Sequence, residues 1–217
     1  MRRNIILFDL DGTLLNTLDD LRSAVNHTMN VFGYPERTRE EVRRFVGNGA
    51  ARLLQLAVPA GEDWQAPLAE FQCYYREHCQ EATAPYPGIS AALEALSAHP
   101  IAVVSNKPDA ATKRLCAQYF PGVYAQGEQP DCPRKPAPDM VRAAMARIGV
   151  ECCVYVGDSE VDVLTAANAG VPCLSVLWGF RDKAEIQAVG GSHFCESPAQ
   201  MPAILEKMIK ELKENGQ

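Results

Sequence analysis

Short runs of apolar residues mark four predicted strands. Each run is rich in Val, Ile or Leu and is followed at once by polar residues or glycine, a pattern typical of a short buried strand that ends at a loop. The four predicted strands are Asn4–Phe8, Ile101–Val104, Cys152–Val156 and Cys173–Leu177.

Apolar residues at helical spacing occupy stretches around and between the later strands. The predicted helices are Ile89–Ser97, Ala110–Tyr119, Pro138–Ile148 and Glu160–Ala169. Strands that alternate with helices indicate βαβ units, and therefore an α/β fold with a Rossmann-like parallel sheet and helices on both faces. Ligands of such sheets bind beyond the carboxyl ends of the strands, so the residues that follow each strand are the candidates for function.

The interval from Thr17 to Ala84 has a different pattern. It contains no convincing strand, and its apolar residues recur at helical spacing. This periodic set is Leu18, Leu21, Val25, Met29, Leu53, Leu54, Leu56, Leu68, Phe71, Tyr74 and Tyr75. We therefore expect an all-α cap domain over residues 16–84, placed over the active edge of the sheet, and an α/β core domain formed by residues 1–15 and 85–217.

The C-terminal segment is predicted to form a helix that packs on the core. Ser197 and Gln200 have the spacing of a capping box, and Pro198 would take the first helical position. An apolar stripe follows, formed by Ile204, Leu205, Met208, Ile209 and Leu212.

Composition and charge narrow the classes of function. The 217 residues include 21 Lys plus Arg and 27 Asp plus Glu, a net charge of −6. This balance argues against binding to nucleic acid or to an anionic membrane, which would require a basic face. No apolar run is long enough to span a membrane, and the run before Asp9 is too short for a signal peptide, so we expect a cytoplasmic protein. For the oligomeric state, we expect a monomer or a homodimer.

The eight cysteines do not have the spacing of a metal site. No C-x-x-C pair occurs, and Cys152 and Cys153 are adjacent. Adjacent cysteines are poorly placed to share one tetrahedral ion. We expect buried small side chains or free thiols.

Acidic residues follow two of the predicted strands. Asp9 and Asp11 lie two apart in extended chain and can face one ligand, while Asp158 and Asp162 lie four apart at the start of a helix. Taken singly, these pairs also fit a turn or a helix start, and Lys135 fits a solvated lysine. If the strands are parallel neighbours, however, the four carboxylates converge and repel one another by roughly 3 kcal/mol per pair. Either a shared proton or a divalent cation would relieve this repulsion; the cation is the better explanation, and oxygen ligands favour Mg²⁺.

These residues resemble the four motifs of the haloacid dehalogenase superfamily. The matching segments, in chain order, are Asp9-Leu10-Asp11-Gly12-Thr13, Ser105, Lys135 and Gly157-Asp158-x-x-x-Asp162. The helical insert resembles that superfamily's C1-type cap. Three further segments are similar to the phosphoglycolate phosphatase group, namely Val46-Gly47-Asn48-Gly49-Ala50, Ser105-Asn106-Lys107-Pro108 and Trp178-Gly179-Phe180-Arg181. Asn16 stands where many members have Asp, a departure that leaves the motifs intact.

The resemblance implies a Mg²⁺-dependent phosphatase that acts on a small phosphorylated metabolite. Asp9 would be the nucleophile, and Asp11 would protonate the leaving group and then deprotonate the attacking water. The resemblance places Thr13, Ser105 and Lys135 around the phosphoryl oxygens. It assigns the metal to Asp9, Asp158, Asp162 and the backbone carbonyl of Asp11.

Substrate specificity is expected from residues around the cap. Asn48 and Gly49 lie in a glycine-rich segment of the insert, where backbone N–H groups can bind a carboxylate or hydroxyl. Asn106 and Arg181 are the remaining predicted substrate contacts. The segment around Asn48 also fits a plain interhelical turn, and Arg181 equally fits a surface arginine.

Several functions share this architecture. The best single substrate candidate is 2-phosphoglycolate. A β-phosphoglucomutase-like sugar phosphomutase and a pyrophosphatase are the enzyme alternatives, and a catalytically silent binding protein is the alternative from another class. Unused clustered carboxylates would destabilise a fold without benefit, which argues against the last.

Overall fold

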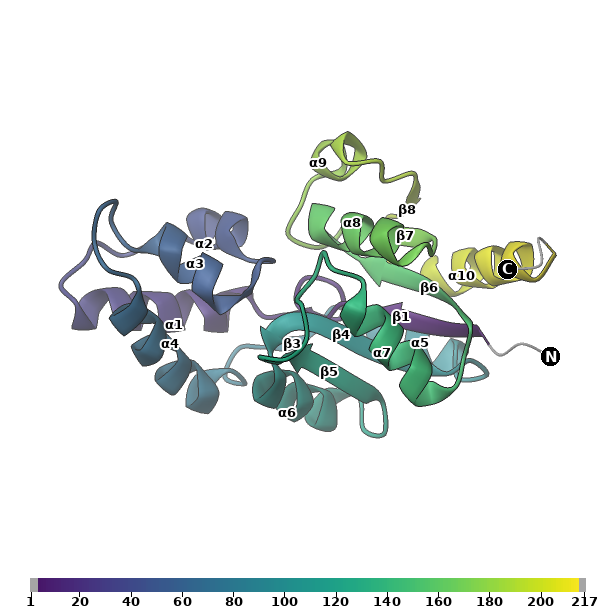
Figure 1. The fold of residues 1–217 in the computed structure, drawn as a ribbon, viewed down its shortest axis with the longest axis horizontal. Coiled ribbons are helices and arrows are strands. Elements are labelled where there is room, and N and C mark those ends of the chain that lie inside the picture. Colours follow the sequence, from purple (N-terminus) through teal and green to yellow (C-terminus); the bar gives the residue numbers. More distant parts are fainter. Residues whose placement is uncertain (1–3, 215–217) are drawn as a thin grey trace.

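A six-stranded parallel sheet forms the centre of the computed structural model, which describes residues 4–214 (Figure 1). Its order is β5-β4-β1-β6-β7-β8, with every neighbouring pair parallel. The strands are β1 (Asn4–Phe8), β4 (Ile101–Pro108), β5 (Tyr124–Glu128), β6 (Cys152–Gly157), β7 (Cys173–Val176) and β8 (His193–Cys195). The predicted α/β fold is confirmed.

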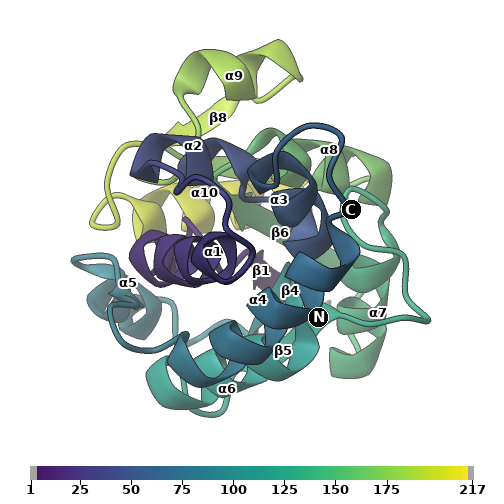
Figure 2. The same ribbon diagram turned by 90° about the vertical axis from the view of Figure 1, so that its left-hand side faces the viewer.

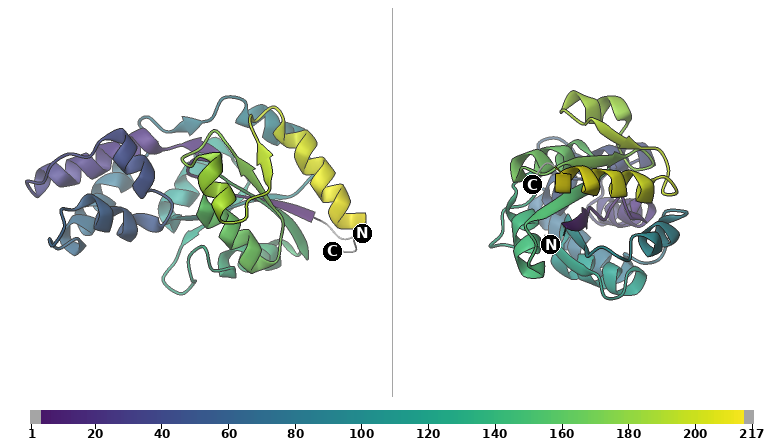
Figure 3. Two further views of the ribbon diagram at one scale, coloured as in Figure 1. Left: turned by 90° about the horizontal axis from the view of Figure 1, so that it is seen from above. Right: turned by 90° about the vertical axis from the view of Figure 1, so that its right-hand side faces the viewer.

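Helices cover both faces of the sheet, because successive residues of each strand point to opposite sides. Ile6 and Phe8 of β1 pack with helices α5, α6 and α10 on one face, and Ile5 and Leu7 pack with α7 and α8 on the other. The left panel of Figure 3 shows α10 along one side of the sheet. These helices are α5 (Ile89–Ala95), α6 (Asp109–Tyr119), α7 (Asp139–Ile148), α8 (Glu160–Ala169) and α10 (Met201–Glu214), and the short α9 (Lys183–Ala188) joins β7 to β8.

Four helices, here called the cap helices, lie together at one end of the molecule (Figure 1, left). They are α1 (Leu18–Val31), α2 (Arg39–Phe45), α3 (Gly49–Ala57) and α4 (Gln65–His78). They pack around a hydrophobic cluster that includes Val25, Leu54 and Phe71, and Phe180 joins this cluster from the core. Figure 2 shows them in front of the strand ends. The division into a cap domain and a core domain stays a prediction.

A two-stranded antiparallel ribbon connects the cap helices to the sheet. It consists of β2 (Leu15–Asn16) and β3 (Ala84–Pro85). Beside it, the buried Asp20 carboxylate accepts hydrogen bonds from the backbone N–H groups of Ala82 and Thr83, at 2.8 and 2.9 Å. The outgoing and returning chain segments are therefore fixed to each other. The sequence did not predict this ribbon.

Other elements differ from the sequence predictions. Strands β5 and β8 and helix α9 were not predicted, and β4 continues to Pro108 instead of ending at Val104. The last helix begins at Met201, because Ser197–Gln200 forms a turn in which Gln200 N–H donates to the carbonyl of Ser197. The Gln200 side chain accepts from Glu196 N–H, so the predicted capping box is wrong. Within residues 4–214, no helix is long and apolar enough to cross a membrane.

Candidate active site

A cavity lies between the carboxyl ends of the strands and the cap helices. It encloses about 600 Å³ including its open mouth. Core residues at the strand ends supply its polar floor, including Asp9, Asp11, Ser105 and Asp158. The cap residues that line it, all in the described part of the chain, are uncharged: Leu21, Val46, Gly47, Gly49, Ala50, Leu53, Phe71 and Tyr75.

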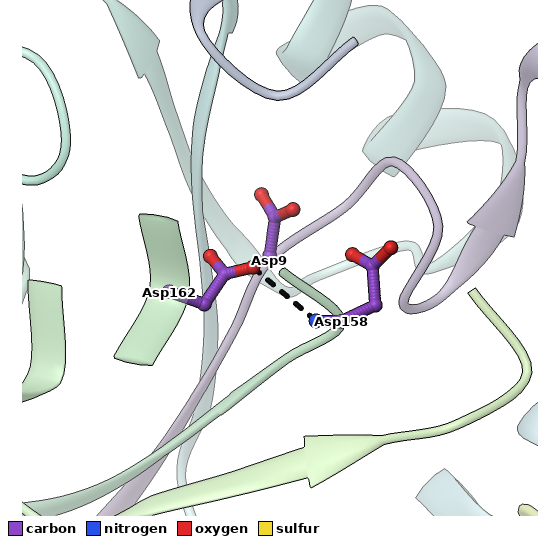
Figure 4. A group of neighbouring side chains, drawn as sticks. All are labelled: Asp9, Asp158 and Asp162. Atoms are coloured by element: carbon purple, nitrogen blue, oxygen red, sulfur yellow. Dashed lines mark hydrogen bonds between the residues drawn. The ribbon is translucent and has the colours of Figure 1, made fainter. Parts of the chain in front are cut away.

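Three aspartates from two distant segments meet at this floor (Figure 4). Asp9 follows β1, while Asp158 and Asp162 come from the loop after β6 and from the first turn of α8. One carboxylate oxygen of each lies within 4.8 Å of the others, and all three residues are buried. Because β1 and β6 are parallel neighbours, their carboxyl ends coincide and bring these residues together.

Lys135 joins two of these carboxylates. Its Nζ donates to Asp9 Oδ1 at 2.7 Å and to Asp162 Oδ1 at 2.8 Å, and it also contacts the Tyr155 hydroxyl at 3.0 Å. The lysine is 2% exposed. Such short charge-assisted bonds fix the side chains that they connect.

Asp162 serves as an anchor beneath the floor. Its Oδ2 accepts from the backbone N–H groups of Asp158 and Ser159 and from the Ser159 hydroxyl, the last at 2.6 Å. Its other oxygen accepts from Lys135 and Tyr155. With both oxygens so occupied, Asp162 orients Lys135 and the loop that carries Asp158.

The Asp158 carboxylate is held from two sides. Thr13 Oγ1 donates to Asp158 Oδ1 at 3.1 Å, and Phe180 N–H donates to Oδ2 at 2.7 Å. Trp178 Nε1 donates to the Thr13 carbonyl at 3.0 Å and thereby links the two supporting segments. In this structure the Thr13 hydroxyl is used on Asp158, so its predicted contact with phosphoryl oxygens stays a prediction.

Burial dominates the electrostatics of the aspartate group. It raises the pKa of the Asp9 carboxyl to about 7, although Lys135 acts in the opposite direction. Burial and the Asp162 charge raise the pKa of Asp158 well above its ordinary value. Burial alone would lower the pKa of Lys135, but Asp162 and Asp9 raise it well above its ordinary value. Lys135 is therefore a permanent cation, and it compensates only part of the negative charge.

Ser105 and Asn106 lie at the end of β4. Ser105 lines the cavity and accepts a hydrogen bond at Oγ from the Lys107 backbone N–H at 3.3 Å. The Asn106 side chain connects the Lys135 backbone to the cap: its Nδ2 donates to the carbonyls of Gly47 and Lys135, and its Oδ1 accepts from Lys135 N–H. Asn106 therefore fixes the backbone of Lys135 relative to the cap. A direct contact between Asn106 and the substrate stays a prediction.

The other predicted substrate contacts are differently placed. Gly49 lines the cavity, and Asn48 is the residue that precedes α3, without a side-chain capping bond. The Arg181 guanidinium donates to the cap carbonyls of Arg43, Arg44 and Val46, at 2.7 to 3.2 Å. Its Nε donates to Glu160 at 3.0 Å. Arg181 therefore attaches the cap to the core at the edge of the cavity.

Two residues at the site were given no functional role from the sequence. Lys107 Nζ donates to Asp11 Oδ1 at 2.8 Å and to the Tyr75 hydroxyl at 2.6 Å. A usable signal was present for Lys107, since it lies two residues beyond Ser105 on a strand and so shares its side. Tyr75 had only the apolar periodicity of a core position.

Comparison with known proteins places this geometry in a family. Residues 6–176 match the family described as haloacid dehalogenase-like hydrolase. The chain belongs to this family. A phosphoglycolate phosphatase from Rhodobacter capsulatus is 32% identical over 215 residues, which cover 93% of this chain and 96% of that protein. One from Cereibacter sphaeroides (strain ATCC 17029) is 34% identical and covers 94% and 98% of the two chains.

Solved structures agree with this placement. A protein from Lactobacillus delbrueckii subsp. bulgaricus superimposes with a TM-score of 0.85 at 34% identity, over 94% of this chain and 99% of that one. A haloacid dehalogenase-like family protein from Streptococcus pneumoniae gives 0.85 at 22% identity, covering 93% and 97%, which shows the shared fold. The chain is a haloacid dehalogenase-type hydrolase of the phosphatase kind, in the group that resembles phosphoglycolate phosphatases.

Proposed function

We propose that this hydrolase cleaves a small phosphate monoester, with 2-phosphoglycolate as the foremost candidate, in a reaction that requires Mg²⁺ and passes through an aspartyl-phosphate. The observation that carries the proposal is the position of Asp9. Its carboxylate lies on the cavity floor, bonded through one oxygen to Lys135 and close to Asp158. The names of the full-length relatives support the choice of substrate.

The aspartate group has the charge and the donor atoms that suit a divalent cation. Ionised Asp9, Asp158 and Asp162 beside one Lys135 leave two negative charges uncompensated. Hard carboxylate oxygens are the ligands that Mg²⁺ prefers. Asp9, Asp158 and the backbone carbonyl of Asp11 would hold the ion, and Asp162 would bind it directly or through water. When bound, the ion neutralises phosphate charge and keeps Asp9 ionised.

Asp9 attacks the phosphorus atom of the ester. Lys135 occupies its Oδ1, which leaves Oδ2 for the attack. A P–O bond forms to Asp9 as the bond to the ester oxygen breaks, and Asp11 donates a proton to that departing oxygen. Ser105 and Lys135 hold the phosphoryl oxygens and stabilise their charge in the transition state.

The second half of the reaction regenerates Asp9. Asp11, now a carboxylate, takes a proton from a water molecule that attacks the phosphorus of the aspartyl-phosphate. The bond between phosphorus and Asp9 breaks, and inorganic phosphate is released. Closure of the cavity by the uncharged cap residues limits the entry of bulk water during the first half.

A substrate panel tests the proposal. The purified protein is assayed with Mg²⁺ on 2-phosphoglycolate, sugar phosphates, nucleotides and pyrophosphate, with phosphate release as the readout. We expect the highest kcat/KM for 2-phosphoglycolate. Preference for pyrophosphate, or conversion of a sugar phosphate to its isomer, would replace the substrate assignment. A flat and feeble profile would contradict the phosphatase proposal.

Metal removal tests the cofactor separately. EDTA should abolish phosphate release from the best substrate, and added Mg²⁺ should restore it. The same treatment should leave the secondary structure unchanged by circular dichroism. A rate that is indifferent to EDTA would contradict the charge argument for Asp9 and Asp158.

A further inference from the structure

We propose that Lys107 is a positioning residue that holds Asp11 in place for proton transfer, and that Tyr75 of the cap in turn holds Lys107. This inference rests on the proposed function, because it concerns the residue proposed as acid and base. It adds a dependence of that residue on the cap, through one hydrogen-bonded chain from α4 to the cavity floor.

The contacts form an unbroken path. Lys107 Nζ lies 2.8 Å from Asp11 Oδ1 and 2.6 Å from the Tyr75 hydroxyl. The same nitrogen lies 4.7 Å from the centre of the Tyr75 ring, within the range of a cation–π contact. All three residues line the cavity.

The surroundings restrict this lysine to one role. Its side chain is 2% exposed, and its ammonium lies between Asp11 Oδ1 and the Tyr75 hydroxyl. A buried ammonium requires partners, since desolvation without them is costly. Asp11 and Tyr75 supply them.

Asp11 requires a residue that fixes the position of its carboxyl group, because its own side chain is less buried than that of Lys107. Its side chain is 12% exposed, whereas the Lys107 side chain is nearly inaccessible. An acid that must protonate a departing oxygen is effective only within hydrogen-bond reach of it. Lys107 fixes one Asp11 oxygen and thereby aims the other at the cavity.

The path also connects the reaction to the position of the cap. Tyr75 belongs to α4, and its ring stacks on Phe71 in the hydrophobic cluster of the cap helices. Lys107 belongs to β4 of the sheet. The 2.6 Å contact exists only when α4 lies over β4. Positioning of Asp11 is therefore completed by the cap as it covers the cavity.

The test uses alkyl phosphate esters and the acyl phosphate acetyl phosphate, a series with different leaving groups. Lys107→Met removes the ammonium and keeps the aliphatic stem, Lys107→Arg keeps the charge, and Tyr75→Phe removes only the hydroxyl. Lys113→Met and Tyr34→Phe are matched controls, because Lys113 is exposed and pairs with Asp109, and Tyr34 is an outer cap residue near Glu62. The readout is kcat/KM, which reports the step that expels the leaving group.

We expect a loss that depends on the leaving group. Lys107→Met should lower kcat/KM about 100-fold for alkyl phosphates, whose leaving oxygen needs a proton, and less than about 3-fold for acetyl phosphate, which does not. Tyr75→Phe should show the same trend at about 10-fold, and Lys107→Arg should recover part of the loss. Equal losses across the series, or no loss in Lys107→Met and Tyr75→Phe, would overturn the positioning role of Lys107. Either result would leave the phosphatase proposal standing.

Failure of the proposed function gives a different result. If the wild-type protein hydrolyses no compound of the series with Mg²⁺ present, both the phosphatase proposal and the positioning role fall. If Lys107→Met does not fold, Tyr75→Phe still decides, because it removes one oxygen and retains the stacked ring. A Tyr75→Phe variant with an unchanged leaving-group trend would then overturn the link to the cap.

Discussion

Gly179 packs directly against the side chain of Asp158, leaving no room for a Cβ. Gly12 lies against the same carboxylate, with a φ of +83° that favours glycine. The neighbouring Phe180 N–H donates to Asp158 at 2.7 Å. Two glycines and one backbone donor therefore determine where this proposed metal ligand lies.

Replacing Gly179 with alanine should lower the affinity of the proposed site for Mg²⁺ without removing any ligand. The added Cβ would displace Asp158, and loss of such supporting contacts typically costs 10- to 100-fold in metal affinity. The Mg²⁺ concentration for half-maximal activity should therefore rise at least about tenfold. Gly33→Ala controls for backbone strain alone, since its φ of +71° favours glycine but nothing lies within 4 Å of the added Cβ. An unchanged Mg²⁺ response in Gly179→Ala would contradict the assignment of Asp158 as a ligand.

Replacing Asp9 with asparagine should abolish turnover and leave the fold intact. The amide is a poor nucleophile, and loss of a covalent nucleophile costs at least about a thousandfold in kcat. Lys135 keeps its bond to Asp162, so the cavity floor retains its structure. Asp19→Asn, on the exposed surface of α1, is the matched control. Phosphate release by Asp9→Asn at a rate near wild type would remove Asp9 as nucleophile.

The metal-free protein should lose stability as the pH rises toward 8. The pKa of Asp9 is about 7 in the folded chain and near 3.8 when exposed, so the folded state holds an additional proton between these values. That contribution is fully present below about pH 4 and is lost as the pH rises through 7. Thermal unfolding in EDTA from pH 5 to 8 should show the decline, and Asp9→Asn or added Mg²⁺ should reduce it. A flat profile in EDTA would contradict the pKa assigned to Asp9.

The central fold was predictable because its strands are simple apolar runs. The edge strands were not. β5 contains the buried Gln126 and Gly127 in place of an apolar run, and β8 spans only His193–Cys195. Helix α9 buries only Ile186 among its residues, so it has no periodic stripe for the sequence to display. Tertiary pairing, more than local pattern, creates these elements.

The convergence of the site followed from topology, whereas its finer contacts did not. Parallel neighbours place Asp9 and Asp158 at one sheet edge whatever the loops between them do. The partners of Arg181 and Lys107 depend on how the cap sits on the core, and no spacing in the sequence encodes that arrangement. The sequence therefore did not predict the contacts of side chains that bridge the cap helices and the core.

Arg181 offers a direct test of how the cap is attached. Its guanidinium donates to three cap carbonyls and to Glu160, so Arg181→Met should loosen the cap. We expect faster limited proteolysis between core and cap and a KM raised about tenfold. Arg181→Lys should not rescue, because a lysine lacks the planar fork that reaches several carbonyls.

The control variant for the Arg181 test should leave the cap carbonyls that bind Arg181 in place. Arg44→Met removes an exposed side chain that pairs with Glu40, and it leaves its own backbone carbonyl available to Arg181. It should behave as wild type. A raised KM in Arg181→Met without faster proteolysis would instead support the substrate contact that the sequence suggested.

Cys73 should react with a thiol reagent much faster than the buried cysteines. Cys73 is exposed, whereas burial raises the pKa of Cys116 and Cys153 to about 12. At pH 8 a thiol of pKa 12 is about one part in ten thousand thiolate, the form that reacts. A disulfide reagent such as DTNB should therefore modify Cys73 rapidly and the two buried thiols only after unfolding. Cys73→Ser should remove the fast phase, and rapid modification of Cys116 or Cys153 in the native protein would show that these buried thiols are accessible.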